Sequence, residues 1–570
     1  MSGEEPFLQG ATGGEPPFPP RSGCSVTPLI EAAEMYPRLE EAMLEAKESV
    51  WLGFRVFNPD TRLRADAARS QGLKRWSDLI AATVERGVEV RLLLSDFEPV
   101  MADRLHAGSW NSFRKIREVR DALPEAAQSR LQILVIQHEG EIGWGWRQML
   151  RLALRWRLRR LIEKLLGRLG EEEHVFDVRP GLWRWLKWKG KRPHGWRPGP
   201  PPRLWPATYH QKCAVVDGRT AFVGGLDLDE RRWDDSDHDR QADDTWHDLS
   251  ARIEGRAAHD VARHFADLWN RELPRFAAIV AEWTGGAERT LNPDPLTEIA
   301  SADFGDTREG QGAATVQLVR TRSRKSRALF ATGPVAHIRE IREAHRALIG
   351  SARRCLYIEA QFFRSKAAAD WVIEALAAHP DLEVIVLIAN VPEEIAFLGE
   401  GRNPAHRHGE YLQARALGRI ARAGGPDRVG LFTLVRDRRA NGEERDFEDS
   451  RGTAFGSGII YIHAKLVVAD TDACLLSSAN INGRSFDWDT ELGFLWTERA
   501  GSIGHFRGDL WNRVSDGALG ADARLADWQQ LAFANSNGAP GERKGFVVPY
   551  QLGRARRFGS PYFWIPDSLV

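Results

Sequence analysis

The sequence has few cysteines, no long apolar run and no excess charge of either sign. Its 570 residues include four cysteines and no CxxC pair, so neither a disulfide framework nor a cysteine zinc site is expected. No apolar stretch approaches the roughly 18 residues that span a bilayer. The 79 Lys and Arg residues balance 79 Asp and Glu residues, which excludes a uniformly basic nucleic-acid coat but not a local basic patch. The first 20 residues are acidic and rich in Pro and Gly, unlike a secretory signal, so we expect a cytoplasmic protein.

Short apolar runs that alternate with helix-like segments predict an α/β fold. The strand candidates come in two series of three, one in each half of the chain: 50–57, 88–95 and 131–137, then 355–363, 382–390 and 429–435. We predict a flexible tail over 1–26, a first domain over 27–289, a polar linker over 290–312 and a second domain with a C-terminal tail over 313–570. A basic, Trp-rich stretch over 141–204 is predicted to be an insertion in the first domain.

The same pattern of polar residues occurs once in each half. A His lies two residues before a Lys and seven before an Asp: His210, Lys212 and Asp217 in the first copy, His463, Lys465 and Asp470 in the second. Residues two apart on a strand point to the same face, so each His and Lys should project together. Two lysines can hold phosphate oxygens, one neutral His can attack phosphorus, and the other His can protonate the leaving group. Two copies in register therefore predict phosphoryl chemistry that needs neither a metal nor another cofactor.

The motifs and their surroundings resemble the phospholipase D superfamily. The segments GGLDLDERRWD (224–234), TWHDLSARIEG (245–255), YIEAQFF (357–363) and SSANINGRS (477–485) are similar to segments of classical lipid-cleaving phospholipases D. The resemblance implies two α/β/α domains that are related by pseudo-twofold symmetry, with one active site at their interface.

The resemblance also implies a role for each site residue. His210 is expected to be the nucleophile and His463 the general acid, with Lys212 and Lys465 as phosphate clamps. The other expected roles are orientation of the histidines by Asp248 and Glu491, shaping of the site by Ser478 and Asn480, and structural support by Asp217 and Asp470.

We expect a phospholipase D that hydrolyses or transphosphatidylates glycerophospholipids through a phosphohistidine. A cardiolipin synthase-type phosphatidyltransferase is the nearest alternative, although many such synthases have transmembrane helices. Two further functions stay open, namely a nucleic-acid phosphodiesterase and a non-catalytic membrane-binding scaffold. The scaffold is disfavoured because both His/Lys pairs are intact.

The stretch 141–204 combines 16 Lys and Arg with 6 Asp and Glu, and it contains seven of the 21 tryptophans. Three interpretations are open: contact with an anionic membrane, ordinary packing on the core, or a nucleic-acid groove. We favour the first and expect a monomer that binds phospholipid at a membrane surface as a peripheral protein, with no nucleic-acid partner. The residues expected at the membrane are Trp156, Arg159, Trp183, Trp185 and Trp188.

A second cluster, WDDSDHDRQADDTWHD (233–248), is rich in carboxylates and histidines. It could bind a divalent cation such as calcium, but it lacks the glycine of an EF-hand loop. A solvated acidic loop is the favoured interpretation, with His247 as a scaffold residue.

Overall fold

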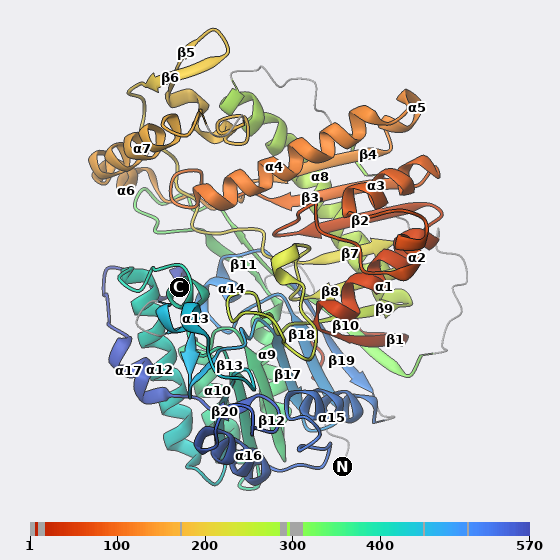
Figure 1. The fold of residues 1–570 in the computed structure, drawn as a ribbon, viewed down its shortest axis with the longest axis vertical. Helices are drawn as coiled ribbons and strands as arrows, with labels where there is room; N and C mark the ends of the chain where they lie inside the picture. Colours follow the sequence, from red (N-terminus) through yellow and green to blue (C-terminus); the bar gives the residue numbers. More distant parts are fainter. Residues whose placement is uncertain are drawn as a thin grey trace.

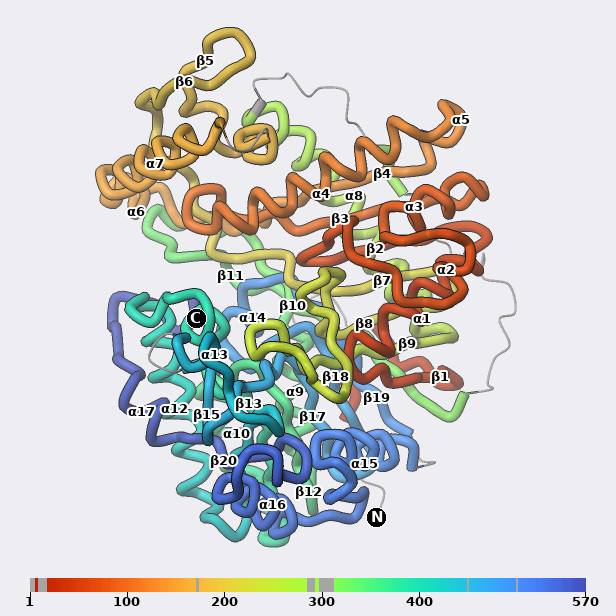
Figure 2. Tube along the Cα trace, viewed as in Figure 1, coloured from red at the N-terminus to blue at the C-terminus, as the bar shows by residue number. Residues whose placement is uncertain are grey.

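The two halves of the chain build one continuous mixed sheet. The computed structural model describes residues 6–8, 18–170, 174–284, 293–296, 312–447, 451–498 and 501–570. In Figure 2 the first half, in red to green, lies above the second half, in green to blue. The halves meet where β1 (Arg21–Ile30) pairs with β10 (Ala314–Arg324), in an antiparallel register that sets Arg21 opposite Val316.

Each half contributes the same order of strands, counted outward from this seam. In the first half, β1 is followed by β9 (Leu249–Glu254), β8 (Thr220–Gly224), β7 (Cys213–Val216), β2 (Ser49–Phe54), β3 (Glu89–Ser95) and β4 (Leu131–Ile136). In the second half, β10 is followed by β19 (Glu491–Glu498), β18 (Ala473–Ser477), β17 (Lys465–Ala469), β12 (Cys355–Ala360), β13 (Glu383–Ile388), β14 (Val429–Leu434) and β20 (Val547–Pro549), and β11 (Val335–Arg339) pairs with β10. The repeated order is the structural form of the sequence duplication.

Helices cover both faces of each half, which gives the predicted α/β/α layers (Figure 1). The strands β3 and β13, at matching positions in the two halves, are mainly apolar and almost wholly buried, as is typical of strands that are covered on both faces. The longer helices of the first half are α1 (Glu31–Glu45), α3 (Trp76–Glu85), α4 (Asp103–Ala122) and α8 (Arg256–Thr284). Those of the second half are α9 (Glu340–Ser351), α10 (Lys366–Ala378), α12 (Pro404–Gly424), α15 (Ser502–Val514) and α16 (Leu525–Asn537). Shorter helices are α2 (Asp66–Ser70), α5 (Glu125–Gln128), α11 (Glu393–Ala396), α13 (Gly442–Asp446), α14 (Gly483–Asp487) and α17 (Leu552–Phe558).

The observed structure differs from the predicted domain ends at the N-terminus, and at the C-terminus it shows how the tail is placed. Residues 21–26, which we predicted to be flexible tail, belong to β1, because their backbone pairs with β9 and β10 at the seam. At the other end, β20 pairs with β14, so part of the C-terminal tail extends the sheet. The predicted linker lies outside the described residues except for 293–296 and 312, so its assignment stays a prediction.

The Trp-rich insertion forms a small unit of its own, which projects from the upper left of the molecule in Figure 1. Its elements are α6 (Trp144–Met149), α7 (Arg151–Leu166), a 3-10 helix (Pro180–Trp185) and a hairpin of β5 (Leu186–Lys189) and β6 (Arg192–Trp196). One face of α7 is buried through Leu154, Leu158, Ile162 and Leu165. Within the described chain, no helix is both long enough and apolar enough to cross a membrane.

Candidate active site

Each histidine motif is anchored to the opposite half of the molecule. His210 precedes β7, and its backbone N–H donates to the carbonyl of Thr490 at 2.8 Å. His463 precedes β17, and its N–H donates to the carbonyl of His247 at 2.7 Å. Thr490 and His247 occupy matching positions just before β19 and β9. Backbone hydrogen bonds between the halves therefore hold both motifs at the interface, where the site was predicted.

Each imidazole is also held by a carboxylate from the opposite half. Nδ1 of His210 lies 2.9 Å from Oε2 of Glu491, and Nδ1 of His463 lies 2.5 Å from Oδ2 of Asp248. All four side chains are buried. A carboxylate on Nδ1 fixes the ring and leaves Nε2 free for chemistry. The sequence predicted these four residues, but not that the pairs cross between the halves.

Burial disfavours the charged form of both members of each pair. It lowers the pKa of both His210 and His463 well below the usual value, with the nearby lysines adding to the effect. It raises the pKa of Glu491 to about 8 and that of Asp248 to about 6. Each pair can therefore hold one proton between its ring nitrogen and its carboxylate.

The two lysines are buried beside the histidines. Nζ of Lys212 donates to the carbonyl of His210 at 2.6 Å and lies 3.9 Å from a carboxylate oxygen of Asp227. Nζ of Lys465 donates to the carbonyl of His463 and, at 3.3 Å, to the amide oxygen of Gln361. Burial lowers the pKa of both ammonium groups, which Asp227 opposes at Lys212. A lysine that is protonated here acts where little water competes with its charge, but the lowered pKa makes that charge easier to lose as the pH rises.

The residues expected to shape the site contact its members. Oγ of Ser478 donates to Oε2 of Glu491 at 2.5 Å, so it supports the carboxylate that holds His210. Nδ2 of Asn480 donates to Gln361 at 3.1 Å, the same amide oxygen that Lys465 contacts.

The two motif aspartates lie away from the reacting groups, at the turns that follow β7 and β17. Asp217 accepts hydrogen bonds from three successive backbone amides, at 47–49, and Asp470 does the same at 353–355. Their φ angles of 51° and 53° place both in the left-handed region, which Asp tolerates better than most residues. Each therefore ties the end of its hairpin to the start of β2 or β12.

A cavity of about 370 Å³ opens over both histidines. Its lining includes four arginines that the sequence patterns did not mark as site residues: Arg55, Arg232, Arg364 and Arg484. The guanidinium of Arg232 lies 3.7 Å from the centroid of Trp246, whose ring packs against that of His463. Arg55 follows β2 where Gln361 follows β12, so the internal duplication could have identified it.

The structure divides the residues expected at the membrane. Trp156 is 61% exposed, Trp188 is 40% exposed, and the exposed guanidinium of Arg159 pairs with Glu163. The expectation for Trp185 was wrong, because its side chain is 4% exposed and lies in the apolar core of the insertion. Trp183 is partly buried and donates to the carbonyl of Phe176.

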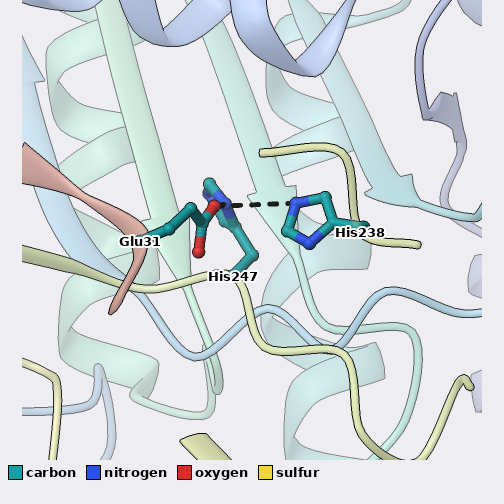
Figure 3. Close-up of side chains that lie close together, drawn as sticks. All are labelled: Glu31, His238 and His247. Carbon is teal, nitrogen blue, oxygen red and sulfur yellow. Dashed lines mark hydrogen bonds and ion pairs between the residues drawn. The ribbon is translucent and has the colours of Figure 1, made fainter. Parts of the chain in front are cut away.

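The loop over 233–248 is not the solvated acidic loop that we favoured. Asp234, His238, His247 and Asp248 are all buried. The loop also reaches the second half, where the backbone N–H of Ala242 donates to Glu444 at 3.0 Å. Its buried members include a cluster of His238 and His247 with Glu31 (Figure 3).

Comparison with known proteins agrees with the resemblance that the motifs suggest. No protein-family model matches the chain. The chain is 27% identical over 263 residues to phospholipase D1 of Homo sapiens, covering 42% of this chain and 22% of that protein. It is 27% identical over 450 residues to phospholipase D2 of Bos taurus (59% and 45% covered) and 25% identical over 397 residues to phospholipase D alpha 1 of Oryza sativa subsp. japonica (53% and 48% covered). The chain thus spans less than half the length of these relatives.

Two solved structures are also similar to the chain. Phosphatidylserine synthase of Haemophilus influenzae matches with a TM-score of 0.47 and 11% identity, over 86% of each chain. The phospholipase D family member Nuc of Salmonella typhimurium matches with a TM-score of 0.22 and 14% identity, over 35% of this chain and 93% of its own. The sequence similarity to phospholipases D agrees with the resemblance of the paired motifs to the phospholipase D superfamily. The three curated relatives given above are all named phospholipase D.

Proposed function

We propose that the chain is a phospholipase D that cleaves the bond between phosphorus and the headgroup oxygen of a glycerophospholipid. The observation that carries the proposal is the pair of crossed His–carboxylate hydrogen bonds beneath one cavity, each beside a buried lysine. This arrangement suits a phosphodiester better than an ester or amide, because it offers two positive charges for non-bridging oxygens in addition to a nucleophile and an acid.

In the first step, Nε2 of His210 attacks phosphorus and the bond from phosphorus to the headgroup oxygen breaks. His463 donates the proton from its Nε2 to that oxygen, so the headgroup leaves as a neutral alcohol. Glu491 keeps the proton of His210 on Nδ1, and Asp248 stabilises the protonated form of His463. The anionic substrate offsets the charge of the nearby lysines, which favours the protonated form of His463 once the substrate is bound.

In the second step, water or an alcohol attacks the phosphohistidine. His463 takes the proton of the attacking oxygen, the bond from phosphorus to Nε2 of His210 breaks, and the starting protonation states return. Water gives phosphatidic acid, and an alcohol gives the phosphatidyl-alcohol. Hydrolysis and transfer therefore use the same residues and differ only in the acceptor.

Contact with a lipid surface is supported by an exposed apolar patch on the insertion. We define the patch as Trp144, Met149, Leu152 and Trp156 of α6 and α7 together with Phe330, all between 55% and 72% exposed. Backbone bonds join α6 to the loop that carries Phe330: the N–H groups of residues 143 and 145 donate to the carbonyls of residues 331 and 329. Basic side chains lie among these residues on α7, and a basic amphipathic surface of this kind binds anionic bilayers.

The test is incubation of the protein with mixed-phospholipid vesicles, with and without ethanol, and identification of the products by mass spectrometry. We expect phosphatidic acid, joined by phosphatidylethanol when ethanol is present, and no product from His210→Ala. Transfer to ethanol or to a lipid alcohol of the vesicles, with no phosphatidic acid, would instead assign a phosphatidyltransferase. Cleavage of single-stranded DNA with no lipid turnover would overturn the proposal.

A further inference from the structure

Next to the active-site residue Asp248, three buried side chains direct metal-ligating atoms toward one point. Nδ1 of His247 lies 2.5 Å from Oε1 of Glu31, and Nε2 of His238 lies 3.6 Å from the same oxygen (Figure 3). All three ligand atoms lie within 4.8 Å of one another, and no other group of three His, Cys, Asp or Glu among the described residues is this close. Atoms bound to one tetrahedral zinc ion at about 2.0–2.2 Å are separated by about 3.4 Å. The two separations to Glu31 differ from that value by about 1 Å or less.

The far nitrogen of each imidazole is held by a further carboxylate. Nδ1 of His238 lies 2.7 Å from Oδ2 of Asp234, and Nε2 of His247 lies 3.0 Å from Oε2 of Glu359. A His ligand whose second ring nitrogen is held by a carboxylate is the usual arrangement in protein metal sites, since it fixes the ring and strengthens the ligand. These contacts leave the two remaining ring nitrogens directed at Glu31.

The backbone at two of the three residues adopts an uncommon conformation. Glu31 has a φ of 64° and His238 a φ of 47°, in the left-handed region that non-glycine residues rarely enter. Conformations of this kind are concentrated at functional sites, where the surrounding structure holds them in place. Glu31 is held from both sides, because its N–H donates to the carbonyl of Asp248 at 3.0 Å while its Oε2 accepts from the N–H of Asp248 at 3.2 Å.

We propose that Glu31, His238 and His247 form a structural site for a divalent metal ion of the zinc class. Two imidazole nitrogens and one carboxylate oxygen are a zinc donor set, whereas calcium prefers six to eight oxygens. Three buried carboxylates surround the two imidazoles, so positive charge at this point balances theirs. One divalent ion supplies the same two positive charges as a proton on each imidazole.

The metal site supports the position of the general acid, His463, and takes no part in making or breaking bonds. His247 precedes Asp248, the partner of His463, and the carbonyl of His247 accepts the N–H of His463. Glu359 comes from β12 in the second half, so the cluster also joins the two halves. A metal ion here would hold Asp248 and His463 in place from behind.

The experiment measures metal content and thermal stability of the full chain, and it does not depend on activity. The protein is stripped with EDTA, incubated with Zn²⁺, passed through gel filtration and assayed by mass spectrometry for bound zinc. We expect about one zinc per chain and a higher Tm than in EDTA. His238→Gln should lose at least tenfold in zinc affinity, as should Glu31→Gln. His345→Gln is the matched control, because His345 is equally buried but its Nδ1 is bonded to the carbonyl of Ile341 instead of a carboxylate.

Two results would overturn the metal site. The first is a wild-type chain that retains no stoichiometric zinc and has the same Tm in zinc and in EDTA, which would assign the cluster to protonated imidazoles. The second is equal zinc binding by wild type and His238→Gln. If the variants fail to fold, X-ray absorption of the zinc-loaded wild type decides the matter: imidazole and oxygen ligands support the site, and sulfur ligands refute it. The metal site and the proposed function can fail separately: lipid turnover without zinc binding would refute only the metal site, and zinc binding without lipid turnover would refute only the proposed function.

Discussion

The crossed carboxylates allow the two histidine roles to be tested separately. Glu491→Gln replaces the carboxylate 2.9 Å from Nδ1 of His210 with an amide of nearly the same size. The loss of one hydrogen bond to a charged group costs about 1.5–3 kcal/mol, or about 10- to 150-fold in rate. The amide can also donate to Nδ1, which moves the ring proton to Nε2 and blocks attack on phosphorus. We therefore expect kcat to fall by about 10³-fold.

Asp248→Asn should give a different pattern, because Asp248 supports the general acid. A lipid with an alkoxide leaving group needs the proton of His463, whereas a p-nitrophenyl phosphodiester needs little help to leave. We expect Asp248→Asn to lose about 10²- to 10³-fold on the lipid but less than tenfold on the activated substrate. Glu491→Gln should lose activity on both substrates, since both require the nucleophile.

The assay is steady-state release of headgroup or p-nitrophenolate, with circular dichroism to confirm folding of each variant. Ser478→Ala is a useful control, because its hydroxyl is bonded to the same Oε2 of Glu491 and to the backbone of Leu492 rather than to His210. This variant should lose only about three- to tenfold. If Glu491→Gln spares the activated substrate while Asp248→Asn does not, the roles of the two histidines are reversed. If both variants lose activity equally on both substrates, the two His–carboxylate pairs do not have separate roles as nucleophile and general acid.

Three further predictions concern charge, stability and membrane contact. Burial lowers the pKa of Lys465 to about 7, so the free enzyme loses this positive charge as the pH rises through 7. We expect kcat/KM to fall above pH 7 for this reason. Lys465→Arg should remove the fall, because Arg stays charged, without restoring full activity. Asp470→Ala removes the acceptor for three backbone amides. It should therefore lower the free energy of unfolding, measured by urea titration, by about 3 kcal/mol or more. A change below about 1 kcal/mol would contradict the structural role of Asp470. Leu152→Ser combined with Trp156→Ser should weaken binding to anionic vesicles, measured by sedimentation, at least tenfold. Phe533→Ser, at an equally exposed apolar position on α16, should leave the binding unchanged. Equal losses in the two variants would mean that the patch is not the contact surface.

The parts of the fold that could be predicted from the sequence are those with a local signal. Mainly apolar runs over 88–95 and 382–390 predicted β3 and β13, because strands covered on both faces are rich in apolar residues. The pairing of β1 with β10 could not be predicted in this way, since the polar segment RSGCSVT alternates weakly and is fixed by partners far along the chain.

The same distinction applies to the site. The residues of the two motifs were recognisable because they repeat at one spacing. Asp248 lies in a segment that carries the resemblance, and Glu491 was identified because it stands at the matching position after the second motif. Arg232 lies in 224–234, a segment that carries the resemblance, but no repeat in the second half marks it. The exposure of Trp156 and the burial of Trp185 could not be separated by composition, since both lie in one Trp-rich, basic stretch.

The exchange of carboxylates between the halves has a consequence for how such a protein could arise. A single ancestral half would have carried a histidine without its own carboxylate partner, and two identical copies would have completed each other as a symmetric dimer. Identical copies must keep identical sites, however. Once both halves lie on one chain, each can change alone, and here one histidine is held by Glu491 with Ser478 while the other is held by Asp248. Fusion thus permits two equivalent histidines to become a nucleophile and an acid.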